Sequence, residues 1–268
     1  METAATTLEQ PSRQASLGKP SFTASLRKRF LLLAYRISCK LYTLFSRNNY
    51  YQQAVPLALY APWNVDQGFQ RAYQRIFANT LVDQYRCFEL WSLVEQVQKL
   101  DEGSIIEIGV WQGGTGVLMA HRVATCGITD PVYLCDTFSG VVKASDKDSF
   151  YKGSEHADTS QAIVEQLVSQ FGLTQVKILK GIFPDETAHL IGDDKFRLCH
   201  VDVDVYQSAK DVVAWVWDRM VPGGIIVYDD YGFLGCDGIT KLVEEQRALS
   251  DRLVFHNLNG HAIVVKLA

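Results

Sequence analysis

The feature that most constrains the fold is a regular alternation of strand-like and helix-like segments. Strand-like runs occur at 104–108, 132–136, 176–180, 196–202 and 225–229. Helix-like stretches separate them at 115–124, 159–171, 185–191 and 207–220. Because each helix returns the chain to the edge at which the previous strand began, such alternation predicts a parallel sheet that is covered by helices on both faces.

The C-terminal end departs from this alternation. After a helix expected near 239–248, strand-like runs at 253–256 and 262–266 flank Asn259-Gly260, a strong hairpin-turn signal. The last strand should therefore run antiparallel to its neighbour. A parallel α/β sheet that ends in a hairpin is the arrangement of S-adenosylmethionine methyltransferases, and a plain dinucleotide-binding dehydrogenase domain does not need it.

The composition is that of a globular chain, with 268 residues of which 47% are apolar and 21% charged. This length suits one large domain, or one domain with a helical appendage. The six cysteines are scattered and include no C-x-x-C pair. This pattern argues against a disulfide framework or a zinc knuckle and favours a reducing, cytoplasmic location.

Charge is distributed unevenly along the chain. Between Gln10 and Val65 every charged residue is basic, whereas acidic residues outnumber basic ones from Asp66 onward, and the net charge is -4. An acidic main body disfavours nucleic acid as a partner.

The N-terminal region divides into a tail and a helical extension. Residues 1–25 are rich in Thr, Ser, Gln and Ala and are typical of a disordered tail. Apolar residues recur at helical spacing over 26–46, with Arg29 and Arg36 on another face, which predicts an amphipathic helix. Base rates favour a helix that packs on the catalytic domain or on a second subunit. Weak contact with a membrane surface is the alternative, and the stretch is too short in apolar residues to span a bilayer.

We expect a loop at 50–66 and a second helix at 79–100, which precedes the first strand of the sheet. The predicted organisation is a tail over residues 1–25, an N-terminal helical extension over 26–78 and a catalytic domain over 79–268.

The first strand is followed by a glycine-rich turn, Glu107-Ile108-Gly109-Val110-Trp111-Gln112-Gly113-Gly114-Thr115-Gly116. Glycines allow a ligand to approach the backbone at the carboxyl end of a strand, where open α/β sheets bind ligands. The full G-x-G-x-x-G pattern is absent, because position 119 is Met, and no G-K-[ST] follows. This turn alone is a weak signal, and it disfavours a phosphate-binding loop.

The second strand ends in Asp136. An acid at this position can accept hydrogen bonds from both ribose hydroxyls of a nucleoside. A turn or helix-capping aspartate is the alternative, but the spacing from Glu107 favours the ribose contact.

Carboxylates follow the fourth and fifth strands, at Asp202, Asp204, Asp229 and Asp230. Adjacent parallel strands bring these ends to the same edge of the sheet. Carboxylates at close range raise the pKa of one another, so a cation is the natural resolution. Oxygen ligands indicate a hard ion such as Mg²⁺, and the His and Cys set that zinc prefers is missing. Solvated loop acids are the minority alternative, and His200 is expected to be a core histidine.

Taken together, the motifs of this chain resemble those of the macrocin (TylF-type) O-methyltransferases, which methylate sugar hydroxyls on antibiotics. The resemblance runs from about Thr80 to the end of the chain. It rests on the following motifs: Glu107-x-Gly109-Val110-Trp111-x-Gly113-Gly114, Asp136-Thr137-Phe138-x-Gly140, Gly181-Ile182-Phe183-Pro184-Asp185-Glu186, Val201-Asp202-Val203-Asp204-Val205-Tyr206 and Asp229-Asp230-Tyr231.

The resemblance implies a fold and a set of site residues. The fold is α/β, a Rossmann-like class I methyltransferase with a seven-stranded, mostly parallel sheet. The metal ligands for Mg²⁺ are Asp202, Asp229 and Asp230, and Asp204 is the candidate base. The family also forms dimers through N-terminal helices.

The resemblance likewise assigns the S-adenosylmethionine contacts. Glu107 and Gly109 would hold the methionine part, Asp136 the ribose and Phe183 the adenine face, and Gly113 and Gly181 belong to the same cofactor-binding motifs. The polar stretch 143–158 is expected to form a lid over the acceptor. His156 in this lid is more typical of a solvated loop histidine than of a substrate contact.

We therefore expect an O-methyltransferase that acts on a hydroxylated small molecule, and the resemblance implies a sugar. A catechol-type phenolic methyltransferase is the nearest alternative, because it uses the same metal chemistry on an aromatic diol. A non-catalytic Rossmann-like scaffold is the alternative from another class.

Overall fold

The computed structural model describes residues 22–44 and 58–267. The chain divides into two compact units, 1–58 and 59–268. In the first, α1 (Phe22–Leu44) occupies most of the stretch predicted to be an amphipathic helix, and apolar side chains such as Phe30 are exposed along it. Most of the predicted tail, and the first half of the expected loop at 50–66, lie outside the described residues. In the part of the chain that is described, none of the helices has the length and apolar character needed to span a bilayer.

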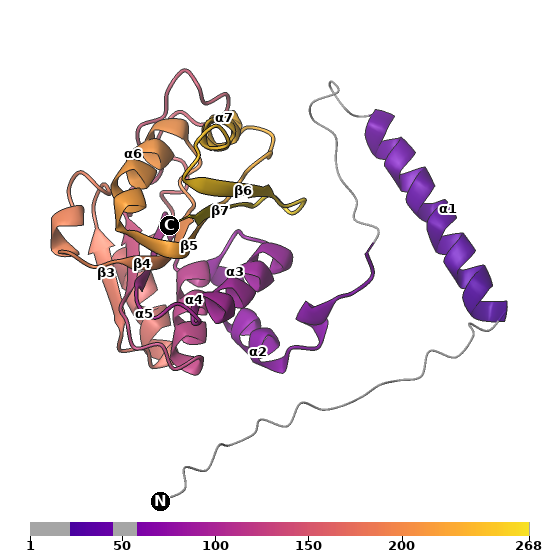
Figure 1. The fold of residues 1–268 in the computed structure, drawn as a ribbon, viewed down its shortest axis with the longest axis horizontal. Coiled ribbons are helices and arrows are strands. Elements are labelled where there is room, and N and C mark those ends of the chain that lie inside the picture. The colour runs from indigo at the N-terminus through magenta and orange to yellow at the C-terminus, as the bar shows by residue number, and fades with distance from the viewer. Residues whose placement is uncertain (1–21, 45–57, 268) are drawn as a thin grey trace, which may run out of the picture. The chain divides into compact units, whose positions relative to one another are not determined.

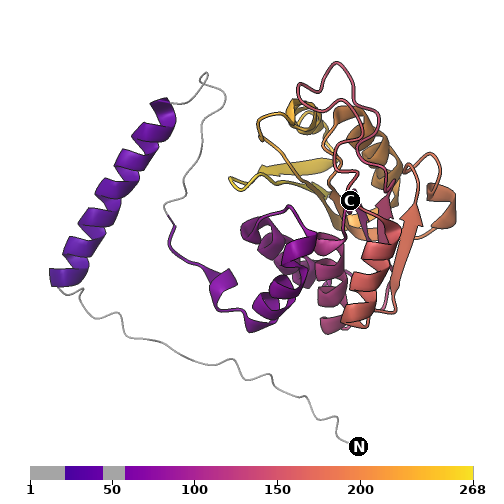
Figure 2. The same ribbon diagram turned by 180° about the vertical axis from the view of Figure 1, so that it is seen from behind.

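The second unit is built on a seven-stranded sheet with the order β3-β2-β1-β4-β5-β7-β6. The strands are β1 (Ser104–Ile108), β2 (Val132–Asp136), β3 (Val176–Lys180), β4 (Phe196–Val201), β5 (Met220–Tyr228), β6 (Arg252–His256) and β7 (Ala262–Lys266). The first five are parallel, and β7 pairs antiparallel with both β5 and β6. The predicted sheet and its terminal hairpin are thus confirmed, and the yellow hairpin closes the orange end of the sheet in Figure 1 and Figure 2.

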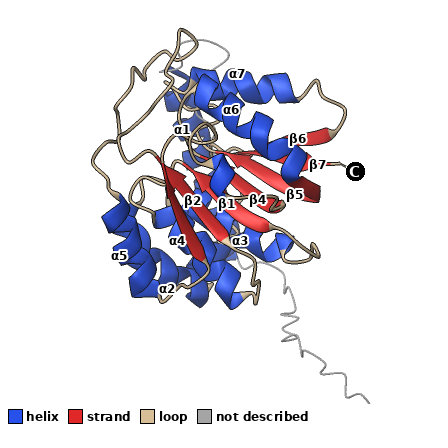
Figure 3. Ribbon diagram, turned by 90° about the vertical axis from the view of Figure 1, so that its left-hand side faces the viewer, coloured by secondary structure: helices blue, strands red, loops and turns tan. Residues whose placement is uncertain are grey.

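Helices cover both faces of this sheet (Figure 3). They are α2 (Gln67–Ile76), α3 (Gln84–Val97), α4 (Gly114–Thr125), α5 (Gln161–Phe171), α6 (Tyr206–Val216) and α7 (Asp237–Gln246). Side chains alternate along a strand, so Ile105 packs with α2 to α5 and Ile106 packs with α6 and α7. The parallel strands are buried on both faces, which explains their nearly continuous apolar sequence.

The helix before the first strand is shorter than expected. The pattern predicted a helix over 79–100, but α3 begins only after Asp83, whose carboxylate accepts hydrogen bonds from the backbone N–H groups of Tyr85 and Arg86. Such an N-cap satisfies donors that have no partner inside the helix. The preceding residues form α2 and a short 3₁₀ turn, η2 (Phe77–Asn79), and α2 packs with α3 and α4 in the unit that begins at Leu59.

Two other elements also differ from the pattern. The helix expected over 185–191 is only a series of turns that ends in the 3₁₀ helix η3 (Ala188–Leu190). Pro184 and Gly192, which has a left-handed φ of 72°, bracket a span too short for a stable α-helix. The remaining 3₁₀ helices are η1 (Pro62–Asn64) and η4 (Trp217–Arg219), and η4 ends α6 before the expected residue 220.

Gly109 sets the distance between the ends of β1 and β4. Its φ is +87°, and a Cβ atom at this position would lie 1.7 Å from the carbonyl oxygen of Asp202. The backbone of the two strand ends is in direct contact here, since Asp202 donates from its N–H to the carbonyl of Ile108 over 2.9 Å. Only glycine therefore fits, because it has no Cβ and adopts positive φ without strain.

We expect Gly109→Ala to be severely destabilising. The free energy of unfolding should fall by about 4 kcal/mol or more, because the added methyl group meets fixed backbone. Gly127→Ala is the matched control: its φ is +75°, but nothing lies within 4 Å of the added Cβ, so only the backbone strain of about 1–2 kcal/mol applies. Urea unfolding of both variants gives the two values, and equal losses would contradict the role assigned to Gly109.

Candidate active site

A cavity that is open to solvent lies at the carboxyl edge of the parallel strands. Residues that follow each of the five parallel strands contribute to its wall: Gly109 after β1, Asp136 at the end of β2, Gly181 and Phe183 after β3, Asp202 and Asp204 after β4, and Asp229 and Asp230 after β5. The structure therefore brings together at one edge most of the residues that the motifs singled out.

Asp136 is held at the cavity wall by the backbone. Its carboxylate accepts a hydrogen bond of 2.8 Å from the N–H of Trp111 and one of 2.6 Å from the N–H of Phe138. Burial raises the pKa of Asp136, and these backbone hydrogen bonds oppose that shift. The carboxylate is thus fixed in direction, and its remaining lone pairs can accept hydrogen bonds from a ligand.

Gly181 and Phe183 lie on the β3 side of the cavity. Gly181 has a φ of +144°, and a Cβ there would lie 2.9 Å from the Glu186 carboxylate. The ring of Phe183 packs edge-to-face against Trp215, with 5.0 Å between the ring centroids. A flat apolar surface therefore lies at the opposite end of the cavity from the acidic residues of β5.

Two of the predicted cofactor contacts do not line the cavity. Glu107 is fully buried, and its Oε1 lies 2.7 Å from Nδ1 of His200, its register partner on β4. Gly113 caps the start of α4 and packs against Val164. The glycine-rich turn thus allows β1, α4 and β4 to pack closely, in addition to forming part of the cavity wall.

The four carboxylates that follow β4 and β5 form one cluster. Burial, and then the charges of Asp229 and Asp230, raise the pKa of Asp202 well above its usual range. Burial and the charges of Asp229 and Asp204 raise the pKa of Asp230 to about 8. Burial also raises the pKa of Asp204, although hydrogen bonds with Tyr151 and Asp230 oppose this. The cluster therefore holds more negative charge than it can keep without a cation.

Asp229 differs from the other three acids because cations already contact it. Nη1 of Arg86, on α3, lies 2.5 Å from Oδ1 of Asp229 and 3.4 Å from Oδ1 of Asp230. Burial raises the pKa of Asp229, but the interactions with His261 and the Arg86 charge outweigh it and hold this pKa below its usual range. The motifs did not identify Arg86, because it lies 143 residues away in the chain on a helix outside the βα units.

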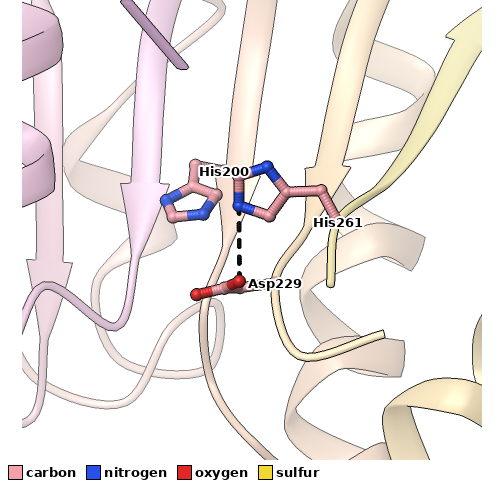
Figure 4. A group of neighbouring side chains, drawn as sticks. All are labelled: His200, Asp229 and His261. Carbon is pink, nitrogen blue, oxygen red and sulfur yellow. Dashed lines mark ion pairs between the residues drawn. The ribbon is translucent and has the colours of Figure 1, made fainter. Parts of the chain in front are cut away.

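His261 supplies the second cationic contact. Its Nε2 lies 3.3 Å from Oδ1 of Asp229, and its Nδ1 lies 2.6 Å from Oε2 of Glu89 (Figure 4 shows the first of these contacts). Burial acts to lower the pKa of His261, but the contacts with Asp229 and Glu89 raise it to about 9. His261 is therefore an imidazolium at neutral pH, and no motif marked it in advance.

Among the described residues, two sets of side chains converge closely enough to share one ion. They are His200 with Asp229 and His261, and Asp204 with Asp230 and Cys236. The trio Asp202, Asp229 and Asp230 is not one of these sets. Arg86 and His261 both contact Asp229 at Oδ1. Asp202 and Asp230 nevertheless line the same cavity as Asp229.

The donor chemistry of the cluster fits a divalent cation. Arg86 and His261 both contact Asp229, and of the other three acids only Asp230 is also reached by Arg86, at 3.4 Å. Asp202, Asp204 and Asp230 carry raised pKa values. All four side chains offer oxygen ligands, which hard ions such as Mg²⁺ prefer. A buried excess of negative charge is stable only when it is neutralised by protons or by a cation.

The expected lid at 143–158 contributes to the cavity wall through two side chains, Tyr151 and His156. The hydroxyl of Tyr151 hydrogen-bonds to Asp204, and burial and the Asp204 charge raise the pKa of this tyrosine. His156 lies 3.4 Å from the same hydroxyl. Tyr151, which was not singled out by the motifs, therefore connects the lid to the acidic cluster.

The first half of the lid is held in place by Lys143 and Asp148. Lys143 forms ion pairs of 2.7 Å with Asp185 and Asp211. Asp148 is buried and accepts a hydrogen bond of 2.9 Å from the N–H of Tyr206, the first residue of α6. A carboxylate at this helix start interacts favourably with the helix dipole, so the lid has a defined anchor beside the site.

Sequence comparison gives one family and several relatives. The model of the macrocin-O-methyltransferase (TylF) family matches residues 53–259. The chain is 28% identical over 190 residues to the mycinamicin III 3''-O-methyltransferase of Micromonospora griseorubida, which covers 66% of this chain and 74% of that protein. It is 29% identical over 170 residues to the 8-demethyl-8-(2,3-dimethoxy-alpha-L-rhamnosyl)-tetracenomycin-C 4'-O-methyltransferase of Streptomyces olivaceus, covering 59% of this chain and 65% of that protein.

Solved structures with the same fold are also found. The O-methyltransferase NovP superposes with a TM-score of 0.61 and 23% identity, over 71% of this chain and 83% of NovP. The calicheamicin methyltransferase CalS11 superposes with a TM-score of 0.57 and 18% identity, over 78% of this chain and 94% of CalS11. At these identities the likeness establishes the fold, which is that of the class I methyltransferases.

Proposed function

The chain belongs to the macrocin-O-methyltransferase (TylF) family, and from this premise we propose that it methylates a hydroxyl of a sugar-bearing small molecule, with S-adenosylmethionine as the methyl donor and Mg²⁺ as an essential ion. Family membership makes the chain a methyltransferase. The observation that carries the rest is the cavity in which Asp136 lies at one strand end and an acidic cluster at two others.

The cofactor assignment rests on the β1, β2 and β3 side of the cavity. Asp136 would accept hydrogen bonds from the ribose hydroxyls, because its carboxylate is already oriented by two backbone N–H groups. Gly109 would let the methionine part approach the end of β1, and Phe183 would provide an apolar surface for the adenine, beside the backbone of Gly181. Glu107 and Gly113 do not reach the cavity, so we assign them to the support of this surface.

The acidic residues define the methyl-accepting side. We assign Asp202, Asp229 and Asp230 as the residues that would hold Mg²⁺. The chemistry that such an ion supplies is Lewis acidity, which lowers the pKa of a substrate hydroxyl. Asp204, with its raised pKa and its hydrogen bond to Tyr151, is placed to accept the hydroxyl proton.

The reaction is an in-line displacement. The substrate oxygen forms a bond to the methyl carbon, the bond from that carbon to the sulfonium sulfur breaks, and the hydroxyl proton passes to Asp204. The electron pair of the broken bond stays on sulfur, which leaves as a neutral thioether. Alignment of the reacting atoms by the cavity wall and the lid can supply several kcal/mol of the barrier reduction.

Sugar acceptors are favoured by the names of one sequence relative and one protein of the same fold. The Streptomyces olivaceus relative is named for a dimethoxy-rhamnosyl tetracenomycin, and the enzyme CalS11 is described as a TDP-rhamnose 3'-O-methyltransferase. A vicinal diol on a sugar also suits an oxygen-ligand metal site. The catechol-type alternative shares the metal chemistry, and a substrate comparison separates the two.

We further propose that the chain forms a homodimer in which α1 packs its exposed apolar side chains against a second subunit, with weak contact to a membrane surface as the alternative use of this basic helix. We place the enzyme in the cytoplasm. The cysteines of residues 58–267 form no disulfide, which accords with that compartment.

Asp136→Ala is expected to weaken binding of S-adenosylhomocysteine by about 10- to 100-fold, because each lost hydrogen bond to a charged group contributes about 1.5–3 kcal/mol. Asp158→Ala is the matched control. Asp158 accepts a hydrogen bond of 2.9 Å from the indole N–H of Trp111 but is not among the residues that line the cavity. Isothermal titration of both variants measures the effect, and equal affinities would remove Asp136 from the cofactor site.

The proposed reaction is tested by transfer of a labelled methyl group to a panel of glycosides and catechols, with and without Mg²⁺. We expect product from glycosides with vicinal hydroxyls and little from catechols. Excess chelator should abolish turnover and added Mg²⁺ should restore it, while S-adenosylhomocysteine binding stays unchanged. Full activity in chelator would exclude the metal, and a preference for catechols would exclude the sugar acceptor.

Asp204→Asn should lower kcat by about 10²- to 10⁴-fold, the usual contribution of a general base. Binding of Mn²⁺, a paramagnetic substitute for Mg²⁺, should be retained in this variant, because Asp204 is not one of the proposed ligands. Stopped assays and electron paramagnetic resonance give the two readings. A near-normal kcat would show that another group accepts the proton.

A further inference from the structure

His261 is buried against the acidic cluster, but the reaction proposed above assigns it no role. We propose that His261, oriented by Glu89, is a positioning residue that fixes the Asp229 carboxylate so that it can ligate the ion. This inference rests on the proposed metal-dependent function and deepens it.

The sheet register places His261 next to Asp229. β5 and β7 are antiparallel, and their pairing runs from Ile225↔Val265 to Tyr228↔Ala262. One further step along the two chains brings Asp229 opposite His261. The side chain of His261 is fully buried at this point, and its Nε2 lies 3.3 Å from Oδ1 of Asp229.

The imidazole ring is held from its other side. Nδ1 of His261 lies 2.6 Å from Oε2 of Glu89, on α3. The Glu89 carboxylate also accepts hydrogen bonds from the side-chain amides of Asn257 and Asn259, in the loop between β6 and β7, the second over 3.1 Å. The ring therefore cannot turn without the loss of contacts at both nitrogens, and α3 anchors the hairpin loop that carries it.

Both side chains that contact Asp229 do so at the same oxygen. His261 and Arg86 each approach Oδ1, Arg86 at 2.5 Å. Since Asp229 lines the cavity, we assign Oδ2 as the oxygen that meets the ion. Side chains that hydrogen-bond to ligating carboxylates orient the ligand, and their loss commonly lowers metal affinity by about 10- to 100-fold.

A second reading of the same side chains is a metal site. His200, Asp229 and His261 converge (Figure 4), and each histidine offers Nε2 while its Nδ1 faces a carboxylate. The charges disfavour this reading. Arg86 already lies on Oδ1 of Asp229, so another cation at this oxygen would face a buried guanidinium. The positioning role accommodates Arg86 and His261 together.

Two polar substitutions separate the contacts of the ring. His261→Asn keeps an amide near the position of Nδ1 and loses the reach of Nε2 to Asp229. His261→Gln is long enough to donate to Asp229 from the position of Nε2. His256→Gln is the control, because His256 lies on the same hairpin but packs edge-to-face against Tyr231. The readings are Mn²⁺ affinity by electron paramagnetic resonance, the number of ions bound, and S-adenosylhomocysteine affinity by titration calorimetry.

We expect His261→Asn to weaken Mn²⁺ binding by about 10- to 100-fold, with His261→Gln and His256→Gln within a few-fold of the unsubstituted protein. S-adenosylhomocysteine affinity should be unchanged in all three, which excludes a general loss of structure. Excess Mg²⁺ should restore much of the activity of His261→Asn.

Three outcomes would overturn the inference. Equal Mn²⁺ affinity in His261→Asn and His261→Gln would show that the contact to Asp229 does no positioning. A second bound ion that is lost in His200→Asn would make the histidines ligands instead. If the unsubstituted protein binds neither Mn²⁺ nor Mg²⁺, the proposed metal-dependent function itself is wrong. This outcome is distinct from one in which the protein binds the ion but His261 does not position its ligand.

Discussion

The site depends on how four carboxylates are held at one edge of a sheet. The parallel strands β4 and β5 end side by side. The four acids that follow them therefore lie close together: Asp202, Asp204, Asp229 and Asp230. Removal of an acid from water is costly unless its charge is paired. The ion pair with Arg86 lets the buried Asp229 carboxylate remain ionised. The other three carry raised pKa values, which accords with the divalent ion proposed for this edge.

The ion pair also links two parts of the sequence that are far apart. Arg86 is held by Asp83, whose carboxylate caps α3 and lies 2.8 Å from Nε of the guanidinium. The start of α3 is therefore coupled to the end of β5. Loss of one partner from a buried pair costs about 3–5 kcal/mol, so the position of α3 and the ionisation of Asp229 depend on each other.

The sequence predicted the frame well and the supporting side chains poorly. Most strand limits, the sheet type and the positions of the acids at strand ends follow from local periodicity, which a single sequence contains. The main exception is β5, which begins at Met220 and not at the expected residue 225. Arg86, Glu89 and His261 could not be found in this way, because the contacts of Arg86 with Asp229 and of Glu89 with His261 span more than 140 residues. Glu107 shows a further limit of prediction from sequence. Its place beside the glycine-rich turn predicts a contact with the cofactor, but in the structure its carboxylate lies next to His200, its register partner on β4.

The hairpin at the end of the chain has a consequence for the site that a wholly parallel sheet could not provide. Parallel strands all deliver their last residues to the cavity edge, and their first residues to the opposite edge. An antiparallel strand begins at the cavity edge, so the residue just before β7 arrives beside the residue just after β5. His261 and Asp229 are such a pair. The same topology that closes the sheet therefore supplies a basic side chain to the part of the edge where β4 and β5 are followed by four acids.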